Sequence, residues 1–126
     1  MGFKFENLKI WNLALELAGE VSEMVKSFPK DELFILTSQI KRASDSVVLN
    51  IAEGCTLQSK VEFRRFLIIA NRSALEVISC LYLAKQRKLI SIEEFHIKYD
   101  KYEKLIAIIQ ALIRNLQIKQ QENEHK

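Results

Sequence analysis

The chain has 126 residues, of which 48% are hydrophobic, and it carries a formal net charge of +3 with only three glycines and one proline. This length suits one domain with one core, and so few turn-forming residues argue against a β-sandwich or β-barrel and for a few long helices. The mild positive charge is typical of an ordinary soluble surface. Because we find no signal-peptide core and no run of roughly 20 uncharged apolar residues, we expect a cytoplasmic protein that does not enter a membrane. Cys55 and Cys80 are too few for a disulfide framework and are expected to be reduced thiols.

The first predicted helix runs from about Asn7, at the N-cap, to Phe28, and Pro29 ends it. Its apolar residues recur at helical spacing, and a core-facing stripe is expected of Leu8, Trp11, Ala14, Leu15, Ala18, Val21, Val25 and Phe28. A second apolar set falls outside that stripe and consists of Ile10, Leu13, Leu17 and Met24. The apolar arc is therefore wider than a monomeric bundle requires, which predicts a contact with another copy of the chain.

The second predicted helix runs from Asp31, which can cap it, to about Glu53, and Gly54 suits the left-handed position that closes a helix. It carries an apolar stripe at helical spacing, made of Leu36, Ile40, Ala43, Val47 and Ile51. A small and polar stripe lies beside it and contains Gln39, Ala43, Ser46, Asn50 and Glu53. Polar side chains at the edge of a helix–helix contact must find partners, so this stretch is expected to set the register between helices.

Two capping boxes mark the starts of the remaining helices. Ser59 with Glu62 opens a third helix that runs to about Lys88, and Ser91 with Glu94 opens a fourth. The third helix is expected to bury Phe63, Phe66, Leu67, Ala70, Ala74, Val77, Ile78, Leu81 and Ala84. The fourth is expected to bury Phe95, Tyr99, Tyr102, Leu105, Ile106, Ile109, Leu112, Ile113 and Leu116, while Ile108, Ala111 and Ile118 widen its apolar arc.

Short connections between four helices make consecutive helices antiparallel neighbours. We therefore predict an all-α fold, an up-down-up-down antiparallel four-helix bundle. It forms a single domain over residues 1–120, and residues 121–126, which contain no apolar side chain, are expected to be a frayed C-terminal tail.

A family resemblance follows from the order of these residues. Its most specific part is Gln39-x-Lys-Arg-Ala-x-x-Ser46-x-x-x-Asn50-Ile-Ala-Glu-Gly54, supported by Glu62-Phe63-x-x-Phe66-Leu67 and Ala70-x-x-Ser73-x-x-Glu76. The opening helix contributes Phe3, Leu8, Trp11, Ala14 and Phe28-Pro29. From about residue 3 to residue 116 the chain resembles the four-helix-bundle proteins encoded within intervening sequences of bacterial large-subunit ribosomal RNA genes, often described as ribosomal-protein-like.

The resemblance implies a homopentameric, barrel-like assembly of four-helix subunits. It also implies a distant kinship to accessory proteins of diversity-generating retroelements, which bind a reverse transcriptase and nucleic acid. It implies no particular biochemical activity. Two positions depart from the family pattern. Arg72 stands where the family commonly has glycine, and the family often has a basic residue near the position of Leu57.

Six polar residues are expected to form an interhelical hydrogen-bond network that sets register: Gln39, Ser46, Asn50, Glu53, Ser73 and Glu76. A small-molecule or metal pocket is the alternative for this set. The two histidines, His96 and His125, do not supply the paired Glu-x-x-His motifs that a di-iron bundle places on facing helices. Neither a strained turn that presents a serine nor a glycine-rich phosphate loop is evident. We therefore expect no catalytic residue, no metal and no cofactor, and a protein that is not an enzyme.

Basic residues are the remaining candidates for function. The predicted nucleic-acid-binding set is Lys41, Arg42, Lys60, Arg64, Arg65, Arg72, Lys85, Arg87 and Lys88. A solvated or ion-paired face is the alternative, since Arg72 can pair with Glu76 four residues on. In a ring each basic patch is repeated, and phosphate binding strengthens with every contact because counterions are released.

These residues favour a non-enzymatic oligomeric protein that binds structured RNA, either ribosomal RNA or intervening-sequence RNA, or DNA, through phosphate contacts. The self-association interface is expected to use Ile10, Leu13, Leu17, Met24, Ile108 and Ile118. The alternative function is a protein–protein scaffold or accessory subunit, for example one that docks a reverse transcriptase, without direct nucleic-acid binding.

Overall fold

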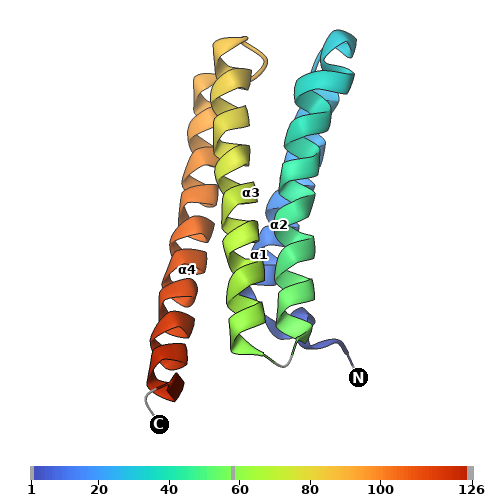
Figure 1. The fold of residues 1–126 in the computed structure, drawn as a ribbon. Coiled ribbons are helices and arrows are strands. Elements are labelled where there is room, and N and C mark those ends of the chain that lie inside the picture. Colours follow the sequence, from blue (N-terminus) through green and yellow to red (C-terminus); the bar gives the residue numbers. More distant parts are fainter. Residues whose placement is uncertain (1, 58, 125–126) are drawn as a thin grey trace.

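The computed structural model describes the backbone of residues 2–57 and 59–124, and side chains over that range other than those of residues 118–121, 123 and 124. Two residues named in the sequence analysis, Ile118 at the expected self-association interface and His125, have side chains outside the described part of the structure. Within the described residues, four α-helices run alternately up and down, which confirms the predicted all-α bundle (Figure 1). They are α1 (Lys9–Met24), α2 (Ser38–Thr56), α3 (Lys60–Gln86) and α4 (Ile92–Glu124).

In Figure 1, α3 and α4 lie side by side, and α1 lies behind α2. The helix α4 continues to Glu124, beyond the predicted boundary at Gln120. The fraying of the last residues stays a prediction.

The core is built from one stripe of each helix. Its side chains with no exposed surface include Leu17, Val21, Ile40, Ile51, Leu67, Leu81, Leu105 and Ile109. Full burial of each such side chain stabilises the fold by roughly 1.5–3 kcal/mol. Cys55 and Cys80 are also buried and free, and burial raises the pKa of both thiols, that of Cys80 to about 11.

The helix α1 buries most of its predicted core-facing stripe, and it also buries residues that the sequence pattern places outside that stripe. Ile10 and Met24 are each 6% exposed and Leu17 is 0% exposed, whereas Leu15, placed in the predicted inner stripe, is 47% exposed. Ile10, Leu17 and Met24 are therefore core residues of the subunit and do not form a surface for another copy. Leu13 is half-buried against the core, and Ile108 is exposed. The physical reason is that the neighbouring helices cover most of the broad apolar arc, and the sequence does not show which edge of the arc they leave exposed.

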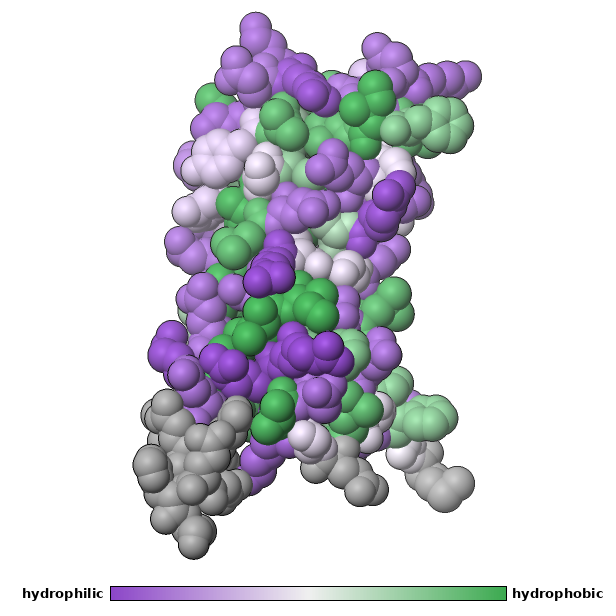
Figure 2. Space-filling view, viewed as in Figure 1, coloured by the Kyte–Doolittle hydropathy of each residue, from purple (hydrophilic) through white to green (hydrophobic). Residues whose placement is uncertain are grey.

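The start of the second helix also differs from the prediction. Two short elements precede α2, a 3₁₀ turn η3 (Lys30–Glu32) and a π-helical turn η4 (Leu33–Thr37), so Asp31 caps no α-helix. In the apolar run that η4 contains, Leu36 is buried while Leu33 is 50%, Phe34 90% and Ile35 58% exposed. We call these three exposed residues the η4 ridge. In Figure 2, hydrophobic side chains gather at the upper right, the end of the molecule where this segment lies in Figure 1.

Gly54 does not close the second helix in a left-handed conformation. The helix α2 continues through it to Thr56, and no described glycine has a positive φ. A Cβ atom on Gly54 would lie 2.6 Å from the Cβ atom of Phe66. Glycine is therefore needed here because α2 and α3 approach closely beside their connecting turn.

Local signals mark both ends of α3. Ser59 accepts a hydrogen bond from the Glu62 amide at 3.3 Å, and the same arrangement at Ser91 opens α4, where the Glu94 amide donates at 3.0 Å. These N-terminal caps confirm the two predicted helix starts. At the other end the Leu89 amide donates to the Ala84 carbonyl at 2.8 Å and Lys88 adopts a φ of 60°, which is a Schellman closure without glycine. The predicted N-cap at Asn7 is wrong, because Leu8 occupies that position.

In the described part of the chain, α3 alone is long and apolar enough to cross a membrane by length and composition. This differs from the expectation that no segment is apolar enough to span a membrane, because charged residues interrupt the apolar runs of α3. A core helix passes the same test, and α3 contributes seven buried residues to the bundle. Only 33% of the most apolar 18-residue stretch of α3 is buried, however. Three large apolar side chains of this helix are exposed, those of Ile69, Leu75 and Leu83. The helix thus has more apolar surface than the subunit covers.

Candidate nucleic-acid interface

The nine predicted basic residues do not form one patch on the subunit. Lys60, Arg64 and Arg65 lie at the start of α3, whereas Lys85, Arg87 and Lys88 lie at or just past its end. At 1.5 Å per residue these groups are separated by roughly 30–40 Å. The other three lie between these ends: Lys41 and Arg42 on α2, and Arg72 midway along α3.

The group at the end of α3 is largely occupied by internal contacts. Arg87 makes a bidentate ion pair with Glu32, at 3.0 and 3.1 Å from the two carboxylate oxygens. The Lys85 ammonium lies 4.5 Å from the centre of the Phe95 ring. Lys88 is exposed and closes the helix. The pair with Glu32 therefore neutralises Arg87 at this end, and the partial negative charge of the helix C-terminus weakens the field of Lys85 and Lys88.

The group at the start of α3 keeps more of its charge, and we call Lys60, Arg64 and Arg65 the basic start of α3. The Arg64 guanidinium donates to the Ile113 carbonyl at 3.3 Å and to Oε1 of Gln117 at 3.2 Å. Both acceptors are neutral, so the contacts position Arg64 without cancelling its charge. Arg65 pairs with Glu62 at 2.7 Å in an exposed pair, which solvent weakens. Lys60 makes no ion pair with a described carboxylate, and the N-terminus of α3 adds a partial positive charge of its own.

Two further basic residues belong to this end of the bundle and escaped the sequence analysis. Arg114 is exposed next to Ile113 on α4, and the charge of Lys4 acts on Cys55 near the end of α2. Both are far from the basic start of α3 in sequence. The antiparallel order of the helices is the signal that could have found them. It brings both the first residues of the chain and the last turns of α4 close to the turn between α2 and α3.

The remaining basic residues are separate. Arg42 donates to the Ser38 hydroxyl at 3.0 Å, and Lys41 is exposed. Arg72 is exposed and pairs neither with Glu76 nor with any other described carboxylate, so the predicted ion pair is not formed and the solvated face remains the alternative for it.

Three of the six residues in the predicted polar network form hydrogen bonds with one another between α2 and α3. The hydroxyl groups of Ser46 and Ser73 are 2.8 Å apart, and the Asn50 amide donates to the Ser46 carbonyl at 2.8 Å and to its hydroxyl at 3.0 Å. Among described side chains, Gln39, Glu53 and Glu76 make no hydrogen bond with them; all three are exposed. The network therefore joins two helices at one point and does not line a cavity.

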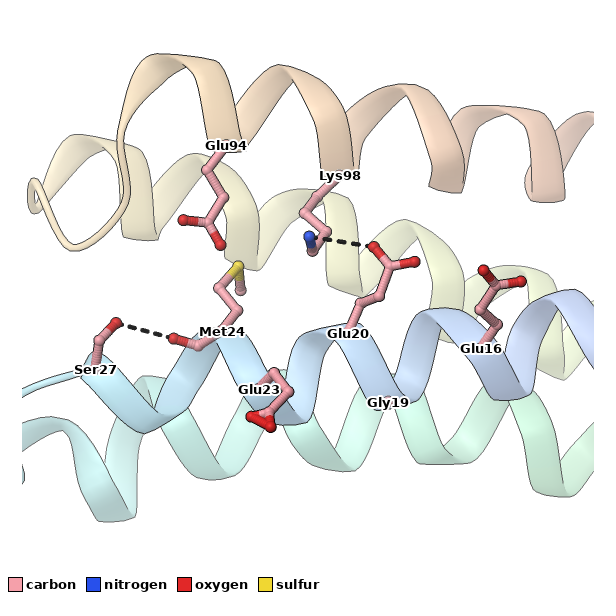
Figure 3. Close-up of a pocket in the computed structure, with 8 residues that line it drawn as sticks. All are labelled: Glu16, Gly19, Glu20, Glu23, Met24, Ser27, Glu94 and Lys98. Atoms are coloured by element: carbon pink, nitrogen blue, oxygen red, sulfur yellow. Dashed lines mark hydrogen bonds and ion pairs between the residues drawn. The ribbon is translucent and has the colours of Figure 1, made fainter.

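A groove of about 530 Å³ lies between α1 and α4, lined chiefly by acidic side chains. Figure 3 shows Glu94 and Lys98 of α4 directed toward α1, where Lys98 meets Glu20. Glu20 also accepts from Lys101, at 3.0 Å to each oxygen. Burial raises the pKa of Glu20, but the hydrogen bonds and charges of the two lysines outweigh that effect and leave the pKa lowered. These contacts fasten α4 to α1.

Among the described residues, no group of three or more histidine, cysteine or carboxylate side chains could hold a metal ion. Within the same residues, three buried polar atoms lack a hydrogen-bond partner, namely Trp11 Nε1, Asn71 Oδ1 and Tyr102 Oη. They lie on different helices and do not converge on one site by any described contact. Burial, followed by the charges of Glu20 and Asp45, raises the pKa of Tyr102.

Comparisons with known proteins place this fold among relatives. A crystal structure of a protein of unknown function from the S23 ribosomal protein family of Bacteroides thetaiotaomicron superposes with a TM-score of 0.78 at 24% identity, covering 83% of this chain and 95% of that one. At that identity the likeness shows the fold alone. No curated protein matches the sequence. A sequence model of the 23S rRNA-intervening sequence protein family matches residues 6–111, which is most of the chain, and the protein is therefore a member of that family.

Proposed function

We propose that this protein is a non-enzymatic, homo-oligomeric nucleic-acid-binding protein that contacts the phosphates of structured RNA. The observation that carries the proposal is the basic start of α3, where Arg64 is held by neutral acceptors at 3.2 and 3.3 Å and keeps its charge. The family name, which refers to 23S rRNA, supports RNA as the partner.

The chemistry fits phosphate binding better than base recognition. Guanidinium and ammonium groups on a helix start, reinforced by the helix dipole, attract phosphate oxygens of any sequence. Recognition of duplex RNA relies largely on shape and backbone contacts, because its major groove is too narrow to read. Three positive side chains give modest affinity in one subunit. Repeated in an oligomer, the same patch gives a strong collective field.

The test is a matched pair of triple variants. Replacing Lys60, Arg64 and Arg65 by glutamine removes three charges from the basic start of α3. Replacing Lys85, Arg87 and Lys88 by glutamine removes three charges from the other end. For a structured ribosomal RNA fragment at low salt, we expect the first variant to lose at least about tenfold in affinity and the second to keep most of it. Far-ultraviolet circular dichroism checks that both fold.

The proposal fails if the two triple variants lose affinity equally, because net charge alone would then explain binding. It also fails if the wild-type protein does not retain the RNA.

The η4 ridge favours a second candidate function, a protein–protein scaffold. Phe34 is 90% exposed, which a soluble surface rarely tolerates within an apolar run. A polypeptide partner that remains bound after nuclease treatment, and is lost when Phe34 is replaced by aspartate, would favour this function over RNA binding.

A further inference from the structure

The η4 ridge is an apolar projection with no cover in the subunit. Its three residues are 50–90% exposed, and the π-helical turn that carries them directs Leu36 and Thr37 inward. Insertions that produce π-helical turns are often associated with functional sites, because they cost stability that a regular helix would keep. A groove of about 380 Å³ runs beside the ridge and is lined by Phe34, Ile35, Ser38, Gln39, Arg42 and Glu76.

An apolar groove of about 200 Å³ lies on the other side of α3, between α3 and α4. Its lining consists of Leu75, Ile78, Tyr99, Glu103 and Ile106. Leu75 is 48% exposed, so the groove opens to the outside of the bundle. We call it the α3–α4 groove.

The ridge and the groove lie on opposite sides of α3. Glu76 borders the cavity beside the ridge, and Leu75, its neighbour in sequence, lines the α3–α4 groove. One feature is therefore on the α2 side of α3 and the other is on the α4 side. A contact between two unlike surfaces joins subunits head to tail, and such contacts close into rings when the rotation between subunits permits.

Charge also matches across these two surfaces. The ridge is bordered by Arg42, whose described polar partner is the neutral Ser38 hydroxyl, and by Lys41. The α3–α4 groove has Glu103 in its lining, and the negative charge of Glu103 raises the pKa of Tyr99 beside it. The ridge thus has two basic neighbours and one acidic neighbour, Glu76, and the α3–α4 groove has one acidic residue in its lining, which favours pairing of the two surfaces.

We propose that the η4 ridge of one copy docks into the α3–α4 groove of a second copy. The inference rests on the homo-oligomer in the proposed function and specifies how its subunits meet. It replaces the interface predicted from α1, most of which the subunit itself buries. It also accounts for the apolar outer surface of α3, since Leu75 and its exposed neighbours would be covered by the next subunit.

A complementation experiment tests the contact. Phe34→Asp damages the ridge but leaves the groove, and Leu75→Asp damages the groove but leaves the ridge. Light scattering after size-exclusion chromatography should give each variant alone the 14.7 kDa mass of one subunit. An equimolar mixture should give a species of twice that mass, because the intact ridge of one variant fits the intact groove of the other.

The control is Leu49→Asp, which places the same charge on another exposed leucine, 65% exposed on α2 and part of neither surface. It should keep the wild-type mass. Circular dichroism should show all three variants folded, since each replaced side chain is about half exposed or more.

The outcomes separate this inference from the proposed function. A wild-type protein of single-subunit mass overturns the oligomer and the contact together. An oligomeric wild type whose mass is unchanged by Phe34→Asp overturns only the contact, as does a mixture that stays monomeric. If Phe34→Asp keeps the oligomer but loses RNA, the ridge is an RNA-binding surface and the docking proposal is wrong.

Discussion

At Gly54 the backbone of α2 comes so close to α3 that a single added carbon has no room. The Cβ atom of an alanine would lie 2.6 Å from the Cβ atom of Phe66 and 3.1 Å from a ring carbon of Phe63. The Cβ atom of Phe66 cannot rotate away, because it is fixed to the α3 backbone. One helix must therefore move.

We expect Gly54→Ala to destabilise the fold by about 1–3 kcal/mol, although alanine has the better helix propensity. Gly19 provides the matched control, because it lies inside α1 and a Cβ atom added there would meet nothing within 4 Å. Gly19→Ala should stabilise the protein by roughly 0.5–1 kcal/mol. Urea unfolding followed by circular dichroism measures both free energies of unfolding, and two changes of the same sign would contradict the close approach.

Single residues also show where sequence reasoning stops. Ser59 and Ser91 were predicted correctly as helix starts, because a capping box depends on residues three apart. Gly54 was assigned to a helix end, because glycine has that role in most local contexts. Its actual role depends on Phe66, which belongs to another helix, and no local pattern reports that distance.

Between elements, one carboxylate of α1 pairs with two lysines of α4. Glu20 receives Lys101 at 3.0 Å and Lys98 at 3.2 Å, with its own side chain 23% exposed. The lysines hold the pKa of Glu20 below the ordinary value of 4.5. The ionised carboxylate is therefore more stable in the folded protein than in the unfolded chain. The resulting stability is present above the unfolded pKa and is lost as the pH falls through the lower folded pKa.

We therefore expect Glu20→Gln to reduce the free energy of unfolding by about 1–2 kcal/mol at neutral pH. The difference from the wild type should shrink as the pH falls below about 4.5, the ordinary pKa of the group. Chemical unfolding at a series of pH values measures it. A difference that is constant down to acid pH would mean that packing, and not the ion pairs, fastens these helices.

The elements themselves and the inward faces of α2, α3 and α4 were predictable from the sequence, and the extent of the buried face of α1 was not. Helical periodicity and few turn residues were enough for four antiparallel helices. The arc on α1 offered both Leu15 and Leu17 to the core, and the structure buries Leu17 while it leaves Leu15 47% exposed. The π-helical turn at Leu33–Thr37 had no sequence signal beyond an apolar run that was longer than one helix face can bury.

Over the whole molecule, the candidate site required distances that a sequence does not contain. Arg87 and Lys60 look equivalent in a list of basic residues. The fold pairs Arg87 with Glu32, 55 positions away, and leaves Lys60 without a described carboxylate partner. Helix order also brings Arg114 toward the same end as Arg64, through the contact of Arg64 with Ile113. The choice of one basic end over the other therefore comes from tertiary structure.

The most direct test of phosphate binding at that end is the salt dependence of RNA affinity. Each lost phosphate contact should lower the slope of log affinity against log salt by roughly 0.7–0.9. For the triple glutamine variant of Lys60, Arg64 and Arg65 we expect the slope to be shallower than the wild-type slope by about two, and for the matched variant of Lys85, Arg87 and Lys88 we expect the wild-type slope. A wild-type affinity that does not change with salt, or an equal loss of slope in both variants, would contradict the account.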